Sequence, residues 1–375
     1  MEQKKHPAVL GGKMRPGGMT VQSYLRHGSH GTAPATSPLT SYPCPVRAFT
    51  VNETQDELSC VVREVDPTPS DHDDLLVKVE FSGVNFKDAM VATRGSRVRR
   101  VASLVAGVDA AGTIVHSTNP DLEVGTRVAV HGGALGVARD GGFAEFIYSP
   151  AKYLSVLPTS ISTRDAMVIG TAGFTAMASI LALEDRGLAS TGDVVVTGAT
   201  GGVGSQAIAY LAARGHQPVA STGSLDQEDW LMGLGAFRVI GRDQVTDKPD
   251  RVLGSELWHG AVDCVGGDTL ARILRSLRYG ASVAASGLVA SAQVDTTVYP
   301  FITRGVSLLG IDAVEATKTT RDRVWAALGE TAPLVNYAAL TDREVGLDAL
   351  PDALDDLRRG ATRGRILVNL APVCP

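Results

Sequence analysis

The chain has 375 residues, more than one ordinary hydrophobic core requires and enough for two or three domains. Hydrophobic residues make up 44% of it and charged residues 20%, which is typical of a globular protein and not of a disordered or fibrous one. The formal net charge is −5, although the first 44 residues carry five basic side chains against one acidic side chain. The rest of the chain is therefore distinctly acidic. It lacks the broad positive surface that nucleic acids require, and we expect no nucleic-acid partner.

The first 45 residues are rich in Gly, Pro, Ser, Thr and His. Such a segment cannot bury enough apolar surface to offset the entropy lost on ordering, so we predict a disordered N-terminal extension over residues 1–45. Its basic composition would also suit an organelle-targeting segment, but its glycines and prolines oppose an amphipathic helix. A dispensable tail, or translation that starts at Met14 or Met19, is the favoured explanation.

The cysteines indicate a reducing environment. Cys44, Cys60, Cys264 and Cys374 lie far apart and form no CxxC pair, so a disulfide framework is not expected. No stretch reaches the roughly 18 uninterrupted apolar residues that a membrane span requires. We therefore expect a cytoplasmic protein without a membrane partner.

The first regular pattern in the body of the chain is an alternation. Residues 75–81 (LLVKVEF) alternate apolar side chains with Lys78 and Glu80, the period of a half-buried strand. Short β-prone pieces follow, separated by Gly and Pro: GTIVHS, TRVAVHG and GGFAEFIYSP. This half of the chain predicts a small, barrel-like β-rich domain.

The pattern changes near Ser162. Ser162 and Asp165 resemble a capping box, and the apolar helical stretch that follows runs towards Glu184 and stops at Gly187. Strands and helices then alternate, which predicts βαβ units and a parallel sheet. The expected strands are DVVVTG, QPVAST, FRVIG, AVDCVG and ASVAASG, and RILVNL near the C-terminus is a further probable strand.

The strongest local signal is DVVVTGATGGVG, residues 193–204, where an apolar strand runs into small residues and then into a helical stretch. The segment fits the dinucleotide fingerprint with Ala199 in the first glycine position. Gly201 would let the backbone approach a pyrophosphate at the helix N-terminus, and Gly204 would permit close helix–strand packing. A tight turn can require glycine for steric reasons alone, but the strand–turn–helix context favours dinucleotide binding.

The end of the next strand indicates which nicotinamide cofactor is bound. An NAD site places Asp or Glu about 20 residues after the turn, whereas this chain has Ser221, Thr222, Gly223 and Ser224. Hydroxyl and backbone N–H groups suit a 2′-phosphate, and Arg242 after the following strand could neutralise its charge. A solvated loop with a surface arginine is the alternative. The missing carboxylate favours NADPH.

A catalytic metal is not expected. Zinc-dependent dehydrogenases hold their metal with Cys and His side chains. Here Gly107, Val108 and Asp109 occupy the place of a zinc-type GHE segment, and the chain contains no cysteine cluster. Cys264, in an apolar strand, suits packing better than chemistry.

Several short segments follow one another along the chain in an order that resembles a known family. They are NFKDA, AGVDAAG, GTAGFTA, LED, TGATGGVG, STG and YPFITRGV. Together they resemble the acryloyl-CoA reductase group of the zinc-free, quinone-oxidoreductase-like medium-chain dehydrogenases/reductases, from about Val46 to Leu370. NFKDA, GTAGFTA, LED and the PFI-x-RGV part of YPFITRGV are more specific than the glycine turn. NFKD is also similar to the NFRD of polyketide-synthase enoyl reductases.

The resemblance implies a GroES-like β-rich catalytic domain and a Rossmann domain with a doubly wound parallel sheet, with NADPH between them. The domains would span 46–168 and 169–300, with a return to the catalytic domain over 301–375. We expect a homodimer. The implied cofactor contacts are Phe86, Thr200, Gly201, Gly202, Val203, Thr222, Gly223, Ser224, Arg242, Leu288 and Ile302.

The chain departs from the family's usual residues at six positions, several of which would border the cofactor or the substrate. The identity of the acyl group therefore stays open. The six departures are Phe86 for tyrosine, Ala134 for tryptophan, Arg139 for histidine, Ser224 for a basic residue, Ala313 for serine and Arg359 for asparagine.

The implied activity is reduction of a 2-enoyl thioester, in which hydride adds to the β-carbon and negative charge develops on the carbonyl oxygen. Asn85 could donate to that oxygen, and Lys87 could do so as a cation or act as the proton donor. Asp88 or Asp109 could hold Lys87 in place, although a purely structural ion pair is the favoured alternative for Asp109. Phe86 can pack against a nicotinamide ring but cannot donate a proton.

Alternatives remain open for the substrate and for the activity itself. Arg94, Arg97, Arg99 and Arg100 could bind the phosphates of CoA or of a carrier-protein arm, but a solvated loop is the commoner explanation. Reduction of a quinone or reactive enal would need the same hydride without a CoA site. A non-catalytic NADPH-binding protein is the third possibility, because a fold does not establish an activity. Asn85 and Lys87 favour an enzyme with a small-molecule substrate, an enoyl thioester or a quinone.

Overall fold

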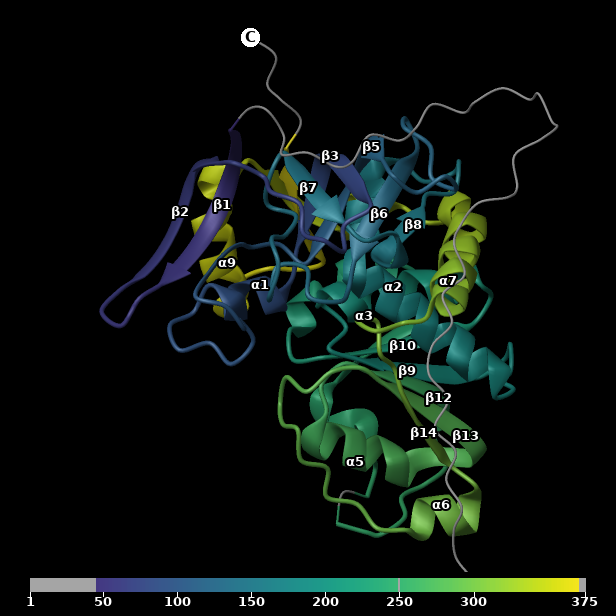
Figure 1. Ribbon diagram of the computed structural model, residues 1–375. Helices are drawn as coiled ribbons and strands as arrows, with labels where there is room; N and C mark the ends of the chain where they lie inside the picture. Colours follow the sequence, from purple (N-terminus) through teal and green to yellow (C-terminus); the bar gives the residue numbers. More distant parts are fainter. Residues whose placement is uncertain (1–44, 249, 371–375) are drawn as a thin grey trace, which may run out of the picture. The chain divides into compact units, whose positions relative to one another are not determined.

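The computed structural model describes residues 45–248 and 250–370 (Figure 1). The predicted N-terminal extension therefore lies outside the described residues except for its last position. In the described ranges the chain forms a three-stranded, a seven-stranded and a six-stranded sheet. The first two form the β-rich domain and the third the parallel-sheet domain, as the change of sequence pattern near Ser162 predicts.

The β-rich domain is built mainly from antiparallel pairs. β1 lies between β2 and β4, and the larger sheet has the order β15-β16-β3-β5-β6-β8 with β7 also paired to β3. The predicted alternation is confirmed in β3, where Val77 and Val79 are buried and Lys78 is partly exposed. The strands are β1 (Val46–Glu53), β2 (Leu58–Val65), β3 (Leu75–Val84), β4 (Ser103–Val105), β5 (Asp109–Ser117), β6 (Arg127–His131), β7 (Phe146–Ser149), β8 (Leu154–Val156), β15 (Thr341–Val345) and β16 (Arg365–Asn369).

The parallel-sheet domain has the strand order β11-β10-β9-β12-β13-β14, and all its pairings are parallel. This is the strand order of a Rossmann fold. Val194 and Val196 of β9 share a core with α3, whereas Val195 faces the core of α5, so helices cover both faces (Figure 1). The elements are β9 (Asp193–Thr197), α3 (Gly202–Ala213), β10 (Gln217–Thr222), α4 (Glu228–Gly233), β11 (Arg238–Gly241), β12 (Trp258–Asp263), α5 (Gly267–Ser276), β13 (Leu277–Ala285), α6 (Tyr299–Arg304) and β14 (Ser307–Gly310).

The sheet includes β14 and so continues past residue 300, where the sequence predicted the parallel-sheet domain to end. The domain limits themselves stay a prediction. Three helices follow β14 along the chain: α7 (Lys318–Thr331), α8 (Tyr337–Leu340) and α9 (Leu350–Arg358).

Helix α2 (Thr163–Asp185) packs against β3 and β5 of the β-rich domain and against α3 of the parallel-sheet domain. It begins as predicted, with the Ser162 side chain accepting the Asp165 N–H at 3.0 Å. Its 23 residues are long and apolar enough to cross a membrane by composition, but 83% of the most apolar window is buried in protein. We therefore describe α2 as the central core helix of the chain. Its backbone leaves the helical region at Gly170, where φ is +48°.

Two main-chain hydrogen bonds of the described residues connect the β-rich domain with the glycine-rich turn and with the segment after β14. Gly364, just before β16, donates its N–H to the carbonyl of Thr200 at 2.9 Å, and Gly133 donates to the carbonyl of Val314 at 3.0 Å. Trp230 of α4 adds a side-chain bond, from its indole N–H to the carbonyl of Ala339 at 2.9 Å. The two halves of the chain are thus fixed to each other at separate places.

The short helix α1 (Phe86–Val91) depends on a buried carboxylate. Asp88 is fully buried, and its two oxygens accept the backbone N–H groups of Asn85 at 2.8 Å and Val108 at 2.9 Å. Complete burial raises the pKa of the Asp88 carboxyl from 3.8 to about 7, although these two N–H groups and the charge of Arg365 oppose the rise. Asp88 therefore fixes the start of α1, where Asn85 and Lys87 lie.

This raised pKa gives a stability prediction. The folded protein holds the Asp88 proton more tightly than the unfolded chain does, so ionising this group lowers the free energy of unfolding as pH rises from about 4 to about 7. Asp88→Asn removes that contribution. We expect the free energy of unfolding of the wild type, minus that of Asp88→Asn, to fall across this range and to be flat above it. Urea unfolding of both proteins at each pH measures this difference. The contributions of the other titrating groups to the free energy of unfolding are the same in both proteins and cancel. A difference independent of pH would contradict the prediction.

Candidate active site

The glycine-rich turn has the geometry of a phosphate site. Gly201 is the N-cap of α3, and Gly198 before it has a φ of +59°. A Cβ on Gly204 would lie 2.3 Å from the carbonyl oxygen of Gly198, so close packing requires glycine there, as predicted. Thr200, Gly201, Gly202 and Val203 are at least partly exposed at the start of the helix, where N–H groups and the helix dipole favour an anion.

The end of β10 presents a second polar region. Ser221 and Thr222 are buried, and the Thr222 hydroxyl accepts the Ser224 N–H at 2.9 Å. The guanidinium of Arg242 lies on the main chain of Gly223, because a Cβ on that glycine would be 2.5 Å from the guanidinium carbon. Arg242 is exposed and forms no ion pair with the residues that the structure describes. Its donors are therefore open to an anion near Ser221–Ser224.

Three large apolar side chains named as cofactor contacts are exposed. Phe86 is 52% exposed, Leu288 67% and Ile302 72%. They come from α1, from the loop after β13 and from α6, so both domains contribute.

The buried carboxylate of Asp109 connects Asn85, the residue before α1, with α2. It accepts the side-chain amide of Asn85 at 2.8 Å, and from Thr171 it accepts the backbone N–H at 2.9 Å and the hydroxyl at 2.6 Å. A Cβ on Gly170 would lie 2.5 Å from this carboxylate, so the kink in α2 makes room for it. Asp109 is thus placed in a structural network, the alternative that the sequence left open.

Arg365, which the sequence analysis missed, completes this network. It is almost fully buried, and its guanidinium lies 3.5 Å from Asp109. It also donates to the carbonyls of Val84 at 3.0 Å and Val168 at 3.1 Å, and to the side-chain oxygen of Asn85 at 3.1 Å. Burial lowers the pKa of the Arg365 guanidinium, and the charges of Asp109 and Asp88 oppose this. The only signal in the sequence is one charged residue at the start of the apolar run RILVNL.

Asn85 and Lys87 differ in whether their side chains have hydrogen-bond partners in the protein. Both N–H groups of the Asn85 amide are used, by the carbonyl of Gly83 at 3.0 Å and by Asp109. Lys87 is half-buried and makes no hydrogen bond or ion pair within residues 45–248 and 250–370. Neither Asp88 nor Asp109 holds it. Lys87 is therefore an unpaired side chain in α1, and hydrogen bonds fix its neighbours Asn85 and Asp88.

His131 is the nearest histidine to this network along the sheet, because it pairs with Asp109 across β5 and β6. It is fully buried against Phe174, with a ring-centroid distance of 4.6 Å. Burial and the neighbouring Arg321 lower the pKa of His131 to about 4, although Asp109 opposes this. His131 is thus neutral near pH 7 and cannot supply a proton to a ligand from its buried position.

Of the four arginines at positions 94, 97, 99 and 100, two bind other parts of the protein. Arg94 donates to the carbonyls of Asp56 and Gln55, both at 2.9 Å, and Arg99 pairs with Glu53 and donates to the carbonyl of Val91. Arg97 and Arg100 are exposed. Two of the four arginines that could bind CoA phosphates, Arg94 and Arg99, therefore make structural contacts instead.

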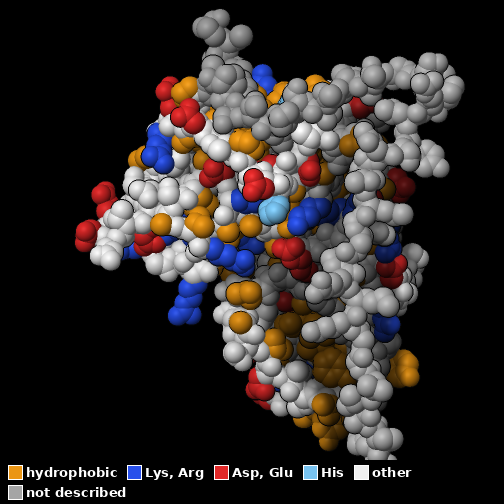
Figure 2. Space-filling model, in the orientation of Figure 1, with side chains coloured by type: hydrophobic (Ala, Val, Ile, Leu, Met, Phe, Trp, Pro, Cys, Tyr) orange, Lys and Arg blue, Asp and Glu red, His pale blue; other side chains and the backbone are white. Residues whose placement is uncertain are grey.

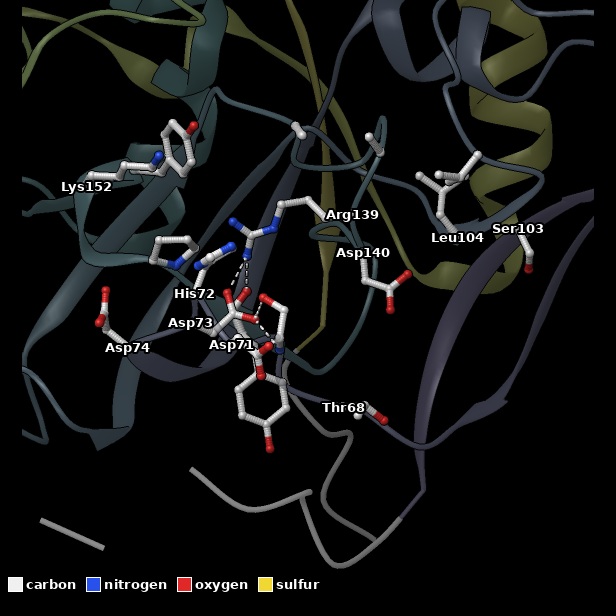
Figure 3. A pocket seen from close by; sticks show the side chains of 17 residues that line it. Thr68, Asp71, His72, Asp73, Asp74, Ser103, Leu104, Arg139, Asp140 and Lys152 are labelled. Carbon is white, nitrogen blue, oxygen red and sulfur yellow. Dashed lines mark hydrogen bonds and ion pairs between the residues drawn. The ribbon is translucent and has the colours of Figure 1, made fainter. Parts of the chain in front are cut away.

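A cavity of about 880 Å³ lies elsewhere in the β-rich domain. Its lining includes Ala134 and Arg139, but neither Asn85 nor Lys87. Figure 3 shows Arg139 pointing to Asp73, which it contacts at 3.1 Å, with Lys152 and Asp140 on other sides. The lining mixes both charges, and Figure 2 shows the same mixture over the visible face of this half of the molecule.

Comparisons with known proteins follow the two domains. The family model "Alcohol dehydrogenase GroES-like domain" matches residues 71–159, and the model "Zinc-binding dehydrogenase" matches residues 202–329. Despite the second name, no three His, Cys, Asp or Glu side chains stand together as metal ligands in the part of the chain that the structure describes. The donor set of a zinc site is missing from those residues.

Individual relatives cover nearly their whole length. "Putative quinone oxidoreductase YhfP" of Bacillus subtilis is 42% identical over 86% of this chain and 98% of its own; its crystal structure "with NAD bound" has a TM-score of 0.83 over 87% of this chain and 99% of its own. "Acrylyl-CoA reductase AcuI" of Ruegeria pomeroyi is 40% identical over 85% of this chain and 97% of its own. The Salmonella enterica yhdH oxidoreductase "in complex with NADP" is 36% identical with a TM-score of 0.82, covering 86% of this chain and 99% of its own. The chain therefore belongs to the medium-chain dehydrogenase/reductase family, in the quinone-oxidoreductase-like group that includes the acrylyl-CoA reductases.

Proposed function

We propose that the protein is an NADPH-dependent reductase of activated C=C bonds, acting on a 2-enoyl thioester similar to acryloyl-CoA. The observation that carries this proposal is the unpaired Lys87 in α1, a helix whose N-terminal end is fixed by Asp88, Asp109 and Arg365. A free cation at a rigid position suits a negative charge that appears only during the reaction. The relative of Ruegeria pomeroyi named acrylyl-CoA reductase supports this substrate class.

The cofactor would lie along the parallel-sheet domain from its adenosine end to its nicotinamide end. Ser221, Thr222, Gly223, Ser224 and Arg242 would receive the 2′-phosphate, because they offer hydroxyl, N–H and guanidinium donors and no carboxylate. The start of α3, residues 200–203, would receive the pyrophosphate. Phe86, Leu288 and Ile302 would cover the nicotinamide end with apolar surface.

Bound NADPH would supply the hydride that the β-carbon of the substrate accepts. The carbonyl oxygen then becomes negatively charged, and Lys87 donates a hydrogen bond to this enolate or the proton that the α-carbon takes. Asn85 is a positioning residue in this scheme, because its amide donors hold Asp109 and the Gly83 carbonyl. Both carboxylate oxygens of Asp109 already accept hydrogen bonds.

Reduction of a quinone is the second candidate, and two observations favour it. The relative from Bacillus subtilis carries the name putative quinone oxidoreductase at 42% identity. In addition, Arg94 and Arg99 are bound within the protein and do not offer a phosphate grip. A quinone needs the same hydride and no CoA site. An NADPH-binding protein without activity is the third candidate.

We propose a homodimeric assembly and a cytoplasmic location. β14 ends the parallel sheet and pairs, within the described residues, only with β13. An open edge with exposed apolar residues invites a second strand, and Tyr279, Val298 and Leu308 are exposed around it. A second copy of β14 would satisfy both the backbone and the apolar surface.

The cofactor assignment predicts at least tenfold tighter binding of NADPH than of NADH. A charge-assisted contact between Arg242 and the 2′-phosphate would supply more than the roughly 1.4 kcal/mol that this ratio needs. Titration of the purified protein with both cofactors measures the ratio, and Arg242→Ala should abolish most of it. Equal affinities in the wild type, or an unchanged ratio in the variant, would overturn the assignment.

The substrate class is decided by turnover. NADPH oxidation is followed with acryloyl-CoA, crotonyl-CoA, 1,4-quinones and small enals at equal concentrations. We expect kcat/KM for at least one enoyl thioester to exceed that of every quinone and enal. A higher value with a quinone would transfer the proposal to the second candidate, and no turnover with any compound would favour the non-catalytic one.

The role of Lys87 gives the sharpest mechanistic prediction. Lys87→Met keeps much of the stem's packing and removes the charge, so kcat on a thioester should fall by ~10²-fold or more, the range that a positioned acid contributes. The loss on quinones should be smaller, because water can protonate their reduced oxygens. Lys318→Met, on exposed positions of α7, is the control and should leave kcat unchanged. Normal turnover per folded molecule in Lys87→Met would remove Lys87 from the mechanism.

A further inference from the structure

Arg363 lies where the β-rich domain meets the glycine-rich turn. Its neighbour Gly364 donates a backbone N–H to the carbonyl of Thr200 at 2.9 Å. Gly364 has a φ of +62°, and a Cβ there would lie 2.3 Å from the carbonyl oxygen of Leu340. The residue next to Arg363 is therefore bonded to the turn that suits a pyrophosphate. This bond fixes the backbone position from which the Arg363 side chain extends.

The Arg363 side chain points across to the parallel-sheet domain. One guanidinium nitrogen donates to the side-chain oxygen of Gln227 at 3.1 Å, and the group lies over the Trp230 ring at 5.3 Å from its centroid. Trp230 is itself anchored to the carbonyl of Ala339. Gln227 ends the short 3-10 helix η2 (Leu225–Gln227), which begins directly after Ser224. Arg363 thus borders both regions that are proposed to receive phosphates.

Most hydrogen-bond donors of Arg363 are unused. A guanidinium has five N–H groups, and a single bond, to Gln227, is made by Arg363 to the described residues. No carboxylate of those ranges forms an ion pair with it, and the residue is exposed. Arg365, two positions later, differs in being buried, with its guanidinium bonded to three oxygens and facing Asp109. Arg363 is the cation of this segment that has donors left for a ligand.

We propose that Arg363 is a cofactor-binding residue that donates hydrogen bonds from the β-rich domain to a phosphate of NADPH. The proposal rests on the NADPH site assigned above. Stacking on Trp230 orients the planar guanidinium. Two of its free N–H groups can then donate hydrogen bonds to two oxygens of one phosphate. Because Arg363 and Arg242 come from different domains, the bound cofactor would add a charged link between the domains.

The test compares Arg363→Gln and Arg363→Lys with the control Arg63→Gln, an exposed arginine of β2. Dissociation constants are measured by calorimetry for NADPH, NADH, 2′,5′-ADP and ADP, together with the melting temperature of each protein. We expect Arg363→Gln to bind NADPH at least tenfold more weakly at an unchanged melting temperature. Arg363→Lys should recover part of the loss, and Arg63→Gln should bind as the wild type does.

The shorter ligands identify the phosphate. A loss for 2′,5′-ADP that ADP does not share assigns the 2′-phosphate, and an equal loss for both assigns the phosphates at the 5′ side. Unchanged NADPH binding in Arg363→Gln overturns the proposal. So does an equal weakening of all four ligands that accompanies a lower melting temperature, since Arg363 would then be only a brace between the domains. A wild type that does not bind NADPH is a separate outcome and contradicts the cofactor site itself.

Discussion

The buried carboxylate of Asp109 makes the interaction on which the arrangement around α1 depends. It accepts bonds from Asn85 before α1 and from Thr171 within α2, and it faces Arg365 at the start of β16. A buried charge is costly unless its hydrogen bonds are filled and an opposite charge is near. Three segments that are far apart in the sequence must therefore meet before this charge can be buried. The contacts between these segments fix the start of α1, while the side chain of Lys87 in this helix stays unpaired.

The features that the sequence predicts well are local ones. The cap at Ser162, the alternation in β3 and the strand–turn–helix of residues 193–204 each depend on residues close together in the chain. The hydrophobic period and the special conformations of glycine determine them with little help from the rest of the molecule. The parallel order of the six strands follows from the same alternation, because parallel strands need a crossover between them.

The features that the sequence does not predict are contacts over long separations. Arg365 bonds to Asn85 from the opposite end of the chain, and no local pattern distinguishes it from the exposed Arg363 two positions earlier. The same holds for Arg94 and Arg99, whose partners lie near β1 and not in a ligand. A list of charged residues cannot separate a structural cation from a binding one. Only the partners of each charge in the folded protein make that distinction.

The bond from Gly364 to the carbonyl of Thr200 joins main chain to main chain. Exchange of side chains at the neighbouring positions leaves both partners in place. Position 364 itself requires glycine, because its φ is +62° and a Cβ there would lie 2.3 Å from the carbonyl oxygen of Leu340. Docking of the two domains is thereby separated from the chemistry of the side chains around it. Side chains near this contact can therefore be replaced without a change in how the two domains are placed.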